Sequence, residues 1–207
     1  MTCRILVAFY SRGGSVEALA RAIGEGAEAG GAEVRLRRAR ELVGQETMAL
    51  APGWSEAAAR MNAAYAAPTV DDADWADGIV LGSPTRFGGA SSELRAWLEG
   101  LGALWVQNKL VDKAGAAFTS TSTPHGGAET TILALYPTLA HLGLVIVPNG
   151  YGAPGSREAG TPYGSSSVSF GLDRRAPTEA DLAIARHQGR RVAEVAAALR
   201  RLRESRA

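Results

Sequence analysis

The chain has 207 residues, of which 46% are hydrophobic, and its formal net charge at pH 7 is +1. This length and apolar content suit one α/β domain with a full core, and nothing in them requires a second domain. A charge so close to zero argues against a nucleic-acid-binding surface, which depends on a clustered basic excess. The expected partner is therefore a small molecule.

Cys3 is the single cysteine, which excludes an intramolecular disulfide and a cysteine-based zinc cluster, and no metal site is predicted. A small apolar filler at the start of a strand explains Cys3 better than a redox thiol does. The first apolar run, residues 5–10, is too short for a signal-peptide core or a membrane span. These features predict a cytoplasmic protein without a membrane segment.

The first elements along the chain form a βαβ unit. Residues 5–10 are continuously apolar, as a parallel strand buried on both faces requires. Apolar residues at helical spacing predict a helix over 16–27, and the glycine pair 30–31 ends it before a second strand at 34–36.

Three further apolar runs predict strands at residues 78–82, 114–119 and 144–147, with helices between them over 94–101 and 132–142. Pro137 is a misfit in the second of these helices, because it removes a backbone donor and should kink or interrupt the helix. Thr178, followed by Glu179 and Asp181, predicts a capped start for a final helix that reaches Leu202.

Five strands alternating with helices predict a doubly wound parallel α/β sheet with helices on both faces. Two segments do not fit this repeat. Residues 40–77 are longer than a connection needs, and their apolar content could form a short helix that packs on a neighbouring subunit. Residues 148–177 form a long segment rich in Gly, Ser, Pro and Tyr, which is expected to be an ordered, functional loop.

Three polar loops that contain glycine each follow a buried strand. They are Ser11-Arg12-Gly13-Gly14-Ser15, Pro84-Thr85-Arg86-Phe87-Gly88 and Ser120-Thr121-Ser122-Thr123-Pro124-His125-Gly126-Gly127. Because ligands of open parallel sheets bind outside the carboxyl ends of the strands, these loops should converge on one crevice.

The first loop suits a phosphate monoester. It lies where free N–H groups and the positive end of a helix dipole coincide, and Ser11 and Ser15 add hydroxyl donors. A capped strand-to-helix turn is the simpler alternative for this loop taken alone. The loop lacks the Gly-x-Gly-x-x-Gly spacing, and Arg37 and Arg38 stand where a Rossmann fold needs an acid. It also lacks a Walker lysine and the second glycine of a serine-hydrolase elbow.

The other two loops provide what a flat heterocycle needs, namely an edge of backbone and hydroxyl donors and an apolar or aromatic contact for its face. Together the three loops best fit a flavin with a terminal phosphate. A surface charge is the alternative explanation for Arg86.

Several spaced motifs resemble one family nearly from end to end. They are Ser-x-x-Gly after the first strand, Gly82-Ser83-Pro84-Thr85-Arg86-Phe87-Gly88, Ser120-Thr121-x-Thr123-x-His125-Gly126-Gly127-x-Glu129-Thr130, Leu139-Ala140-His141, Val145-Ile146-Val147-Pro148-x-Gly150-Tyr151 and Gly160-Thr161-Pro162-Tyr163-Gly164. In combination they resemble the WrbA family of flavodoxin-like NAD(P)H:quinone oxidoreductases. The resemblance implies one flavodoxin-like domain over residues 1–207, with an inserted segment at about 40–77 and a long functional loop at about 148–177.

The resemblance implies FMN bound without a covalent link. Its phosphate would be held by Ser11, Arg12, Gly13, Gly14, Ser15 and Val16. Its ring system would lie against Pro84, Thr85, Arg86, Phe87 and Gly88, and against Ser120, Thr121, Ser122, Thr123, Pro124, His125 and Gly126.

Two further residues match family positions at the flavin site. His141 would reach it from another subunit, although a histidine in an apolar helix is otherwise expected in the core. Trp105 would line the substrate pocket over the flavin, with a core tryptophan as the alternative. Where the family often has Tyr followed by Gly, this chain has Gly13-Gly14, so an aromatic contact for the nicotinamide is missing.

The predicted activity is ping-pong reduction of quinones by NADH or NADPH through the flavin, in a homotetramer or a dimer. The alternative is a flavodoxin-type FMN electron carrier without its own substrate. Such carriers are usually strongly acidic, whereas this chain has 22 Lys and Arg against 21 Asp and Glu. A nucleic-acid-binding role for Arg200, Arg201, Arg203 and Arg206 is less favoured, because the helix dipole alone accounts for arginines in a last turn.

Overall fold

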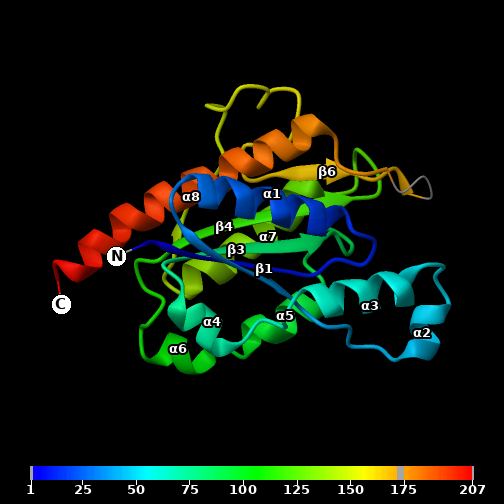
Figure 1. The fold of residues 1–207 in the computed structure, drawn as a ribbon, viewed down its shortest axis with the longest axis horizontal. Helices are drawn as coiled ribbons and strands as arrows, with labels where there is room; N and C mark the ends of the chain where they lie inside the picture. Colours follow the sequence, from blue (N-terminus) through cyan, green and yellow to red (C-terminus); the bar gives the residue numbers. More distant parts are fainter. Residues whose placement is uncertain (1, 172–174, 207) are drawn as a thin grey trace.

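The computed structural model describes residues 2–171 and 175–206, so three residues of the predicted loop 148–177 lie outside the described residues. A parallel sheet with the order β2-β1-β3-β4-β5 forms its centre (Figure 1). The strands are β1 (Arg4–Phe9), β2 (Glu33–Arg38), β3 (Gly78–Pro84), β4 (Ala114–Thr121) and β5 (Val145–Ile146). This order confirms the predicted doubly wound sheet and places the topological switch between β1 and β3.

Helices cover both faces of the sheet. The helix α1 (Ser15–Ala29) and the last helix, α8 (Glu179–Glu204), run side by side on one face (Figure 1). The other face carries α5 (Ser92–Glu99), α6 (Gly102–Val106) and α7 (Ala128–His141). Alternate residues of β1 enter two different cores, with Val7 on the α1 side and Leu6 on the α5 side. Burial on both faces is why this strand reads as a continuous apolar run.

The packing of α1 on α8 depends on glycine. A Cβ at Gly26 would lie 1.9 Å from the carbonyl oxygen of Arg186, and a Cβ at Gly189 would lie 1.9 Å from that of Ile23. The two backbones therefore touch where neither helix has a side chain. The capping box predicted at the start of α8 is present, since Thr178 Oγ1 accepts a hydrogen bond from the Asp181 N–H at 3.2 Å.

The fifth position in the sheet differs from the prediction. Val145 and Ile146 pair with Ala114 and Gly115, and the strand then ends. A short strand that was not predicted, β6 (Ser166–Val168), pairs with the far end of β4 and lies within the segment expected to be a loop. Three residues with two serines carry too little apolar periodicity to predict a strand.

The segment 40–77 forms three short helices rather than one. They are α2 (Gln45–Ala49), α3 (Trp54–Ala64) and α4 (Val70–Trp75). The helix α7 continues through Pro137, so the expected interruption is wrong. Pro137 removes the helical partner of the Leu133 carbonyl, and Leu133 is exposed, so water can solvate that group. Within the described part of the chain, no helix is long and apolar enough to cross a bilayer.

Candidate functional site

The three predicted loops converge on one cavity of 380 Å³ at the carboxyl ends of β1, β3 and β4. Eleven of the predicted site residues line it, namely Ser11, Arg12, Gly13, Ser15, Val16, Pro84, Thr85, Arg86, Ser120, Thr121 and Ser122. Gly14, Phe87, Gly88, Thr123, Pro124, His125 and Gly126 belong to the same loops but do not line the cavity. The volume is within the range of small-molecule sites.

The first loop is shaped to present N–H groups. The backbone N–H of Gly14 donates to Ser11 Oγ at 3.1 Å, and Gly14 has a φ of 106°, a conformation that favours glycine. The helix α1 then begins at Ser15, and the N–H groups of its first turn have no helical carbonyl to bind. These donors and the helix dipole suit an anion.

A buried ion pair supports this loop from behind. Arg38 is fully buried and donates to the Ser11 carbonyl at 2.9 Å, to Asn62 Oδ1 at 2.5 Å and to both carboxylate oxygens of Glu41. Burial by itself would raise the pKa of Glu41, but the hydrogen bonds from Arg38 bring that pKa below its usual value. Because the Ser11 carbonyl is engaged by Arg38, the loop turns its N–H groups rather than this carbonyl toward a ligand.

The second loop is a tight turn. The backbone groups of Arg86 and Gly89 exchange hydrogen bonds of 2.8 and 3.0 Å, and Thr85 N donates to the Ser120 carbonyl at 3.0 Å. Phe87, at the tip, has a φ of 53° and a fully exposed side chain. The turn therefore directs Thr85 and Arg86 to the cavity and leaves Phe87 facing solvent in a single chain.

The third loop is joined to β6 and to the residue that follows it. Ser167 Oγ donates to Ser120 Oγ at 3.0 Å, and Ser169 Oγ donates to the Thr121 carbonyl at 3.2 Å. Ser169 and Gly171, from the segment 148–177, also line the cavity. These two residues were not among the predicted site residues.

The beginning of α3 closes the cavity on its remaining side, which sequence reasoning missed. The lining residues from this segment are Ala51, Pro52, Gly53, Trp54 and Ala57. The Trp54 ring lies under the guanidinium of Arg12, whose central carbon is 3.6 Å from the ring centroid. A lone tryptophan among small residues was the one signal that could have indicated a role for this segment.

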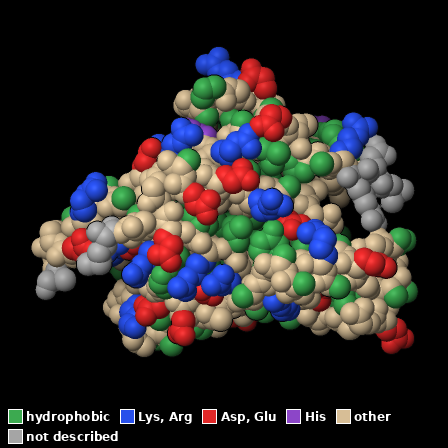
Figure 2. Space-filling model, viewed as in Figure 1, with side chains coloured by type: hydrophobic (Ala, Val, Ile, Leu, Met, Phe, Trp, Pro, Cys, Tyr) green, Lys and Arg blue, Asp and Glu red, His purple; other side chains and the backbone are tan. Residues whose placement is uncertain are grey.

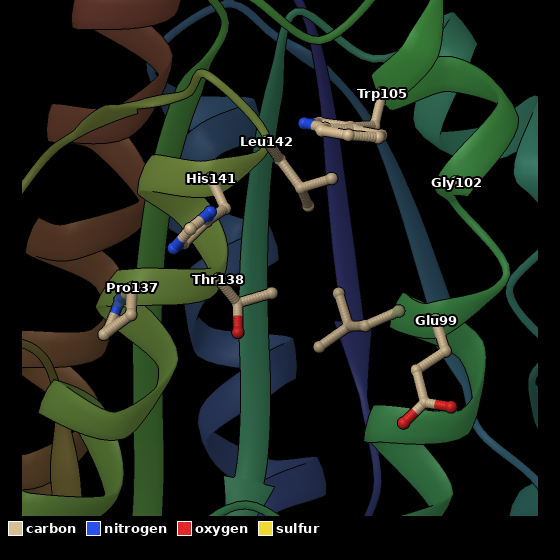
Figure 3. Close-up of a pocket in the computed structure, with 8 residues that line it drawn as sticks. Glu99, Gly102, Trp105, Pro137, Thr138, His141 and Leu142 are labelled. Carbon is tan, nitrogen blue, oxygen red and sulfur yellow. The ribbon is translucent and has the colours of Figure 1, made fainter.

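His141 and Trp105 lie apart from this cavity. Together with Leu98, Glu99, Gly102, Pro137, Thr138 and Leu142 they line a second cavity of 310 Å³ between α7 and the α5–α6 segment (Figure 3). Both side chains are exposed, so neither is the core residue that the alternatives describe. His141 ends α7, about 20 Å along the helix from Ala128 beside the third loop. It does not reach the first cavity of its own chain.

The lining of the first cavity limits its chemistry. Among the described residues it contains no acid, histidine, lysine, tyrosine or cysteine, and its two charged groups are Arg12 and Arg86. Such a site offers donors, positive charge and flat contacts, but no general acid or base. It fits FMN, because the first-turn N–H groups suit the phosphate and the flavin itself would supply the reactive atoms.

Comparison with known proteins agrees with this geometry. Residues 1–158 match the model of the NADPH-dependent FMN reductase family. A "NAD(P)H dehydrogenase (quinone)" of Sinorhizobium fredii is 41% identical over 201 residues, covering 95% of this chain and 98% of the relative. A protein of the same name from Azorhizobium caulinodans is 42% identical over 203 residues, with the same coverage.

Solved structures support the fold. The "flavodoxin, WrbA-like protein" of Agrobacterium tumefaciens has a TM-score of 0.66 at 24% identity, covering 95% of this chain and 99% of its own. A flavodoxin from the domain Archaea has a TM-score of 0.61 at 18% identity, covering 94% and 99%. The family match over residues 1–158, together with near full-length relatives named NAD(P)H dehydrogenase (quinone), shows that the chain belongs to the NADPH-dependent FMN reductase family.

Proposed function

We propose that this protein is an FMN-dependent NAD(P)H:quinone oxidoreductase that reduces quinones by two electrons in a ping-pong sequence. The observation that carries the proposal is the convergence of three loops on a cavity whose lining, in the described residues, has donors and two arginines but no acid or base. The relatives named NAD(P)H dehydrogenase (quinone) supply the substrate class.

The chain's own residues bind and orient. The first turn of α1 and the hydroxyls of Ser11 and Ser15 would hold the phosphate, and Thr85 and Arg86 would contact the ring system. Donors of the loop at 120–126 would stabilise negative charge on the reduced ring. The chemistry that bound FMN supplies is acceptance of hydride from NAD(P)H and delivery of two electrons to a quinone, in separate half-reactions.

Assembly and location belong to the proposal. We place His141 and Trp105 at the flavin site of a neighbouring copy in a homotetramer, with a dimer as the smaller option. Exposed aromatic side chains at Phe87, Trp105 and Tyr151 support association, because aromatic residues are enriched in protein–protein interfaces. A cytoplasmic location suits the single, buried and free Cys3.

The alternative function is a flavodoxin-type electron carrier. Figure 2 shows basic and acidic side chains interspersed on the face in view, rather than an acidic docking field. The late arginines do not form a free basic patch either. Three of them pair with acids of the same chain, in the contacts Arg200–Asp77, Arg203–Asp77 and Arg206–Asp112.

The deciding experiment adds NADH, and separately NADPH, to the FMN-loaded protein without oxygen, and then adds a benzoquinone. We expect loss of the flavin absorbance within seconds and full recovery on addition of the quinone, with the faster donor identifying the preferred nicotinamide. Tight FMN binding without loss of absorbance would instead support the carrier. Absence of FMN binding would overturn the site.

A further inference from the structure

Arg12 and Trp54 form a stacked pair, and Trp54 belongs to a small cluster separate from the two cores that cover the sheet. Both side chains line the first cavity, and the Arg12 guanidinium carbon lies 3.6 Å from the Trp54 ring centroid. Arg12 forms no ion pair or hydrogen bond with any described residue. The acids Glu41 and Glu17 pair instead with Arg38 and Arg60. A cation at a cavity wall without a counter-ion is a ready binding group for an anion.

The first acidic residue after this loop, at the start of α1, is already neutralised. Glu17, in the first turn of α1, is buried and accepts hydrogen bonds from both terminal nitrogens of Arg60, one of them at 2.8 Å. Tyr65 Oη donates to the same carboxylate at 3.0 Å. These hydrogen bonds outweigh the effect of burial and lower the pKa of Glu17. The charge of Glu17 is therefore balanced by α3 and leaves that of Arg12 available.

The same contacts fix Trp54 relative to the loop. Arg60 and Tyr65 join the end of α3 to α1, while Asn62 Oδ1 accepts from Arg38 at 2.5 Å, and Arg38 in turn holds the Ser11 carbonyl. The Trp54 ring packs with Met48, Ala58 and Ala51 in a small core of its own. The segment thus forms a rigid support on which the Arg12 side chain rests.

We propose that Arg12 is the residue that makes this site selective for a phosphorylated flavin over an unphosphorylated one, and that Trp54 is the positioning residue that holds Arg12 beside the first turn of α1. The inference rests on the proposed FMN site. Neutral N–H donors favour an anion modestly, whereas a guanidinium already ordered by stacking adds a full charge and loses little side-chain entropy on binding. The family resemblance places Arg12 in the loop that would hold the phosphate, but it gives no role to Trp54, which comes from the inserted segment.

The test measures dissociation constants of apo-protein for FMN and for riboflavin by quenching of flavin fluorescence. For Arg12→Gln we expect FMN binding to weaken about tenfold, as for loss of one charge-assisted contact, and riboflavin binding to change less than about twofold. Trp54→Leu should weaken FMN binding about threefold with riboflavin again unchanged. In the double variant the losses of FMN affinity should not add, because both substitutions disrupt the same stacked Arg12–Trp54 pair.

Arg21→Gln is the matched control, since Arg21 is exposed on α1, the helix that follows the first loop, and the substitution removes the same charge. Trp54→Phe keeps a flat ring, so it should retain the preference for FMN even if Trp54→Leu folds poorly. Three results would each overturn this inference while leaving the proposed function standing. They are equal weakening of FMN and riboflavin binding in Arg12→Gln, additive losses in the double variant, and an equal effect of Arg21→Gln. If the unaltered protein binds neither FMN nor riboflavin, both the proposed function and this inference fail.

Discussion

Two adjacent glycines at the first loop are there for different reasons. Gly14 has a φ of 106°, which costs any other residue about 1–2 kcal/mol. A Cβ built on Gly13 meets nothing within 4 Å, and the backbone there is outside the left-handed region. Only Gly14 is therefore required by the geometry of the turn.

This difference predicts that substitutions at Gly14 and Gly13 affect stability differently. Gly14→Ala should lower the free energy of unfolding by about 1–2 kcal/mol and weaken FMN binding, because the turn must distort. Gly13→Tyr should leave stability within about 0.5 kcal/mol and, by restoring the aromatic contact, lower the KM for NAD(P)H. Urea unfolding and steady-state kinetics measure both effects. Similar destabilisation by the two substitutions would contradict this account of the loop.

At the level of elements, α4 is fastened to the edge of the sheet through one carboxylate. Asp72 completes the capping box of α4 with Thr69, and it accepts hydrogen bonds from Arg35 at 3.0 Å and Arg37 at 2.9 Å on β2. Burial by itself would raise the pKa of Asp72, but the hydrogen bonds from Arg37, Thr69 and Arg35 lower it below the ordinary 3.8. One side chain thus links helix capping to the attachment of β2.

A carboxyl with a lowered pKa stabilises the fold above its ordinary pKa and loses that contribution as pH falls through the folded-state value. We expect Asp72→Asn to lower the free energy of unfolding by about 2–4 kcal/mol at pH 7, since two arginines lose the negative charge that they share and an amide NH2 group replaces one of its two acceptor oxygens. The difference from the unaltered protein should persist to about pH 5 and shrink below about pH 4. Urea unfolding at pH 7, 5 and 3 tests this, and a gap that stays constant down to pH 3 would contradict it.

At the level of the whole molecule, the second cavity lies on a face that one chain leaves open. Trp105 is 55% exposed there, beside His141, while the first cavity of the same chain is at the other end of α7. Parallel strands and their return helices enforce this separation, because α7 starts at the carboxyl edge of the sheet and ends at the amino edge. His141 can serve the site only across an interface.

Light scattering on the purified protein should therefore give the mass of a tetramer or a dimer. Trp105→Glu places a charge on this face and should reduce the mass toward the 21.5 kDa of one chain. His141→Ala should leave the mass unchanged and weaken FMN binding about threefold, as for loss of one polar contact. A monomer that binds FMN tightly, with no effect of His141→Ala, would show that the site is complete in one chain.

Local patterns in the sequence determined the elements and the convergence of the loops. Buried parallel strands require continuous apolar runs, and the Thr178 capping box and the glycines at 30–31 mark helix ends through short-range hydrogen bonds and backbone freedom. Because parallel strands end at one edge, three loops were enough to locate the cavity.

The tertiary structure alone decided which distant residues complete it. Trp54 stacks on Arg12 across 42 positions of sequence, and β6 pairs with β4 through only three residues. Neither contact produces a periodic pattern in the sequence, since each depends on how α3 and the segment around β6 pack against the sheet. His141 likewise matches a family position in sequence, but its place at the far end of α7, beside Trp105 of α6, follows from the length and direction of α7.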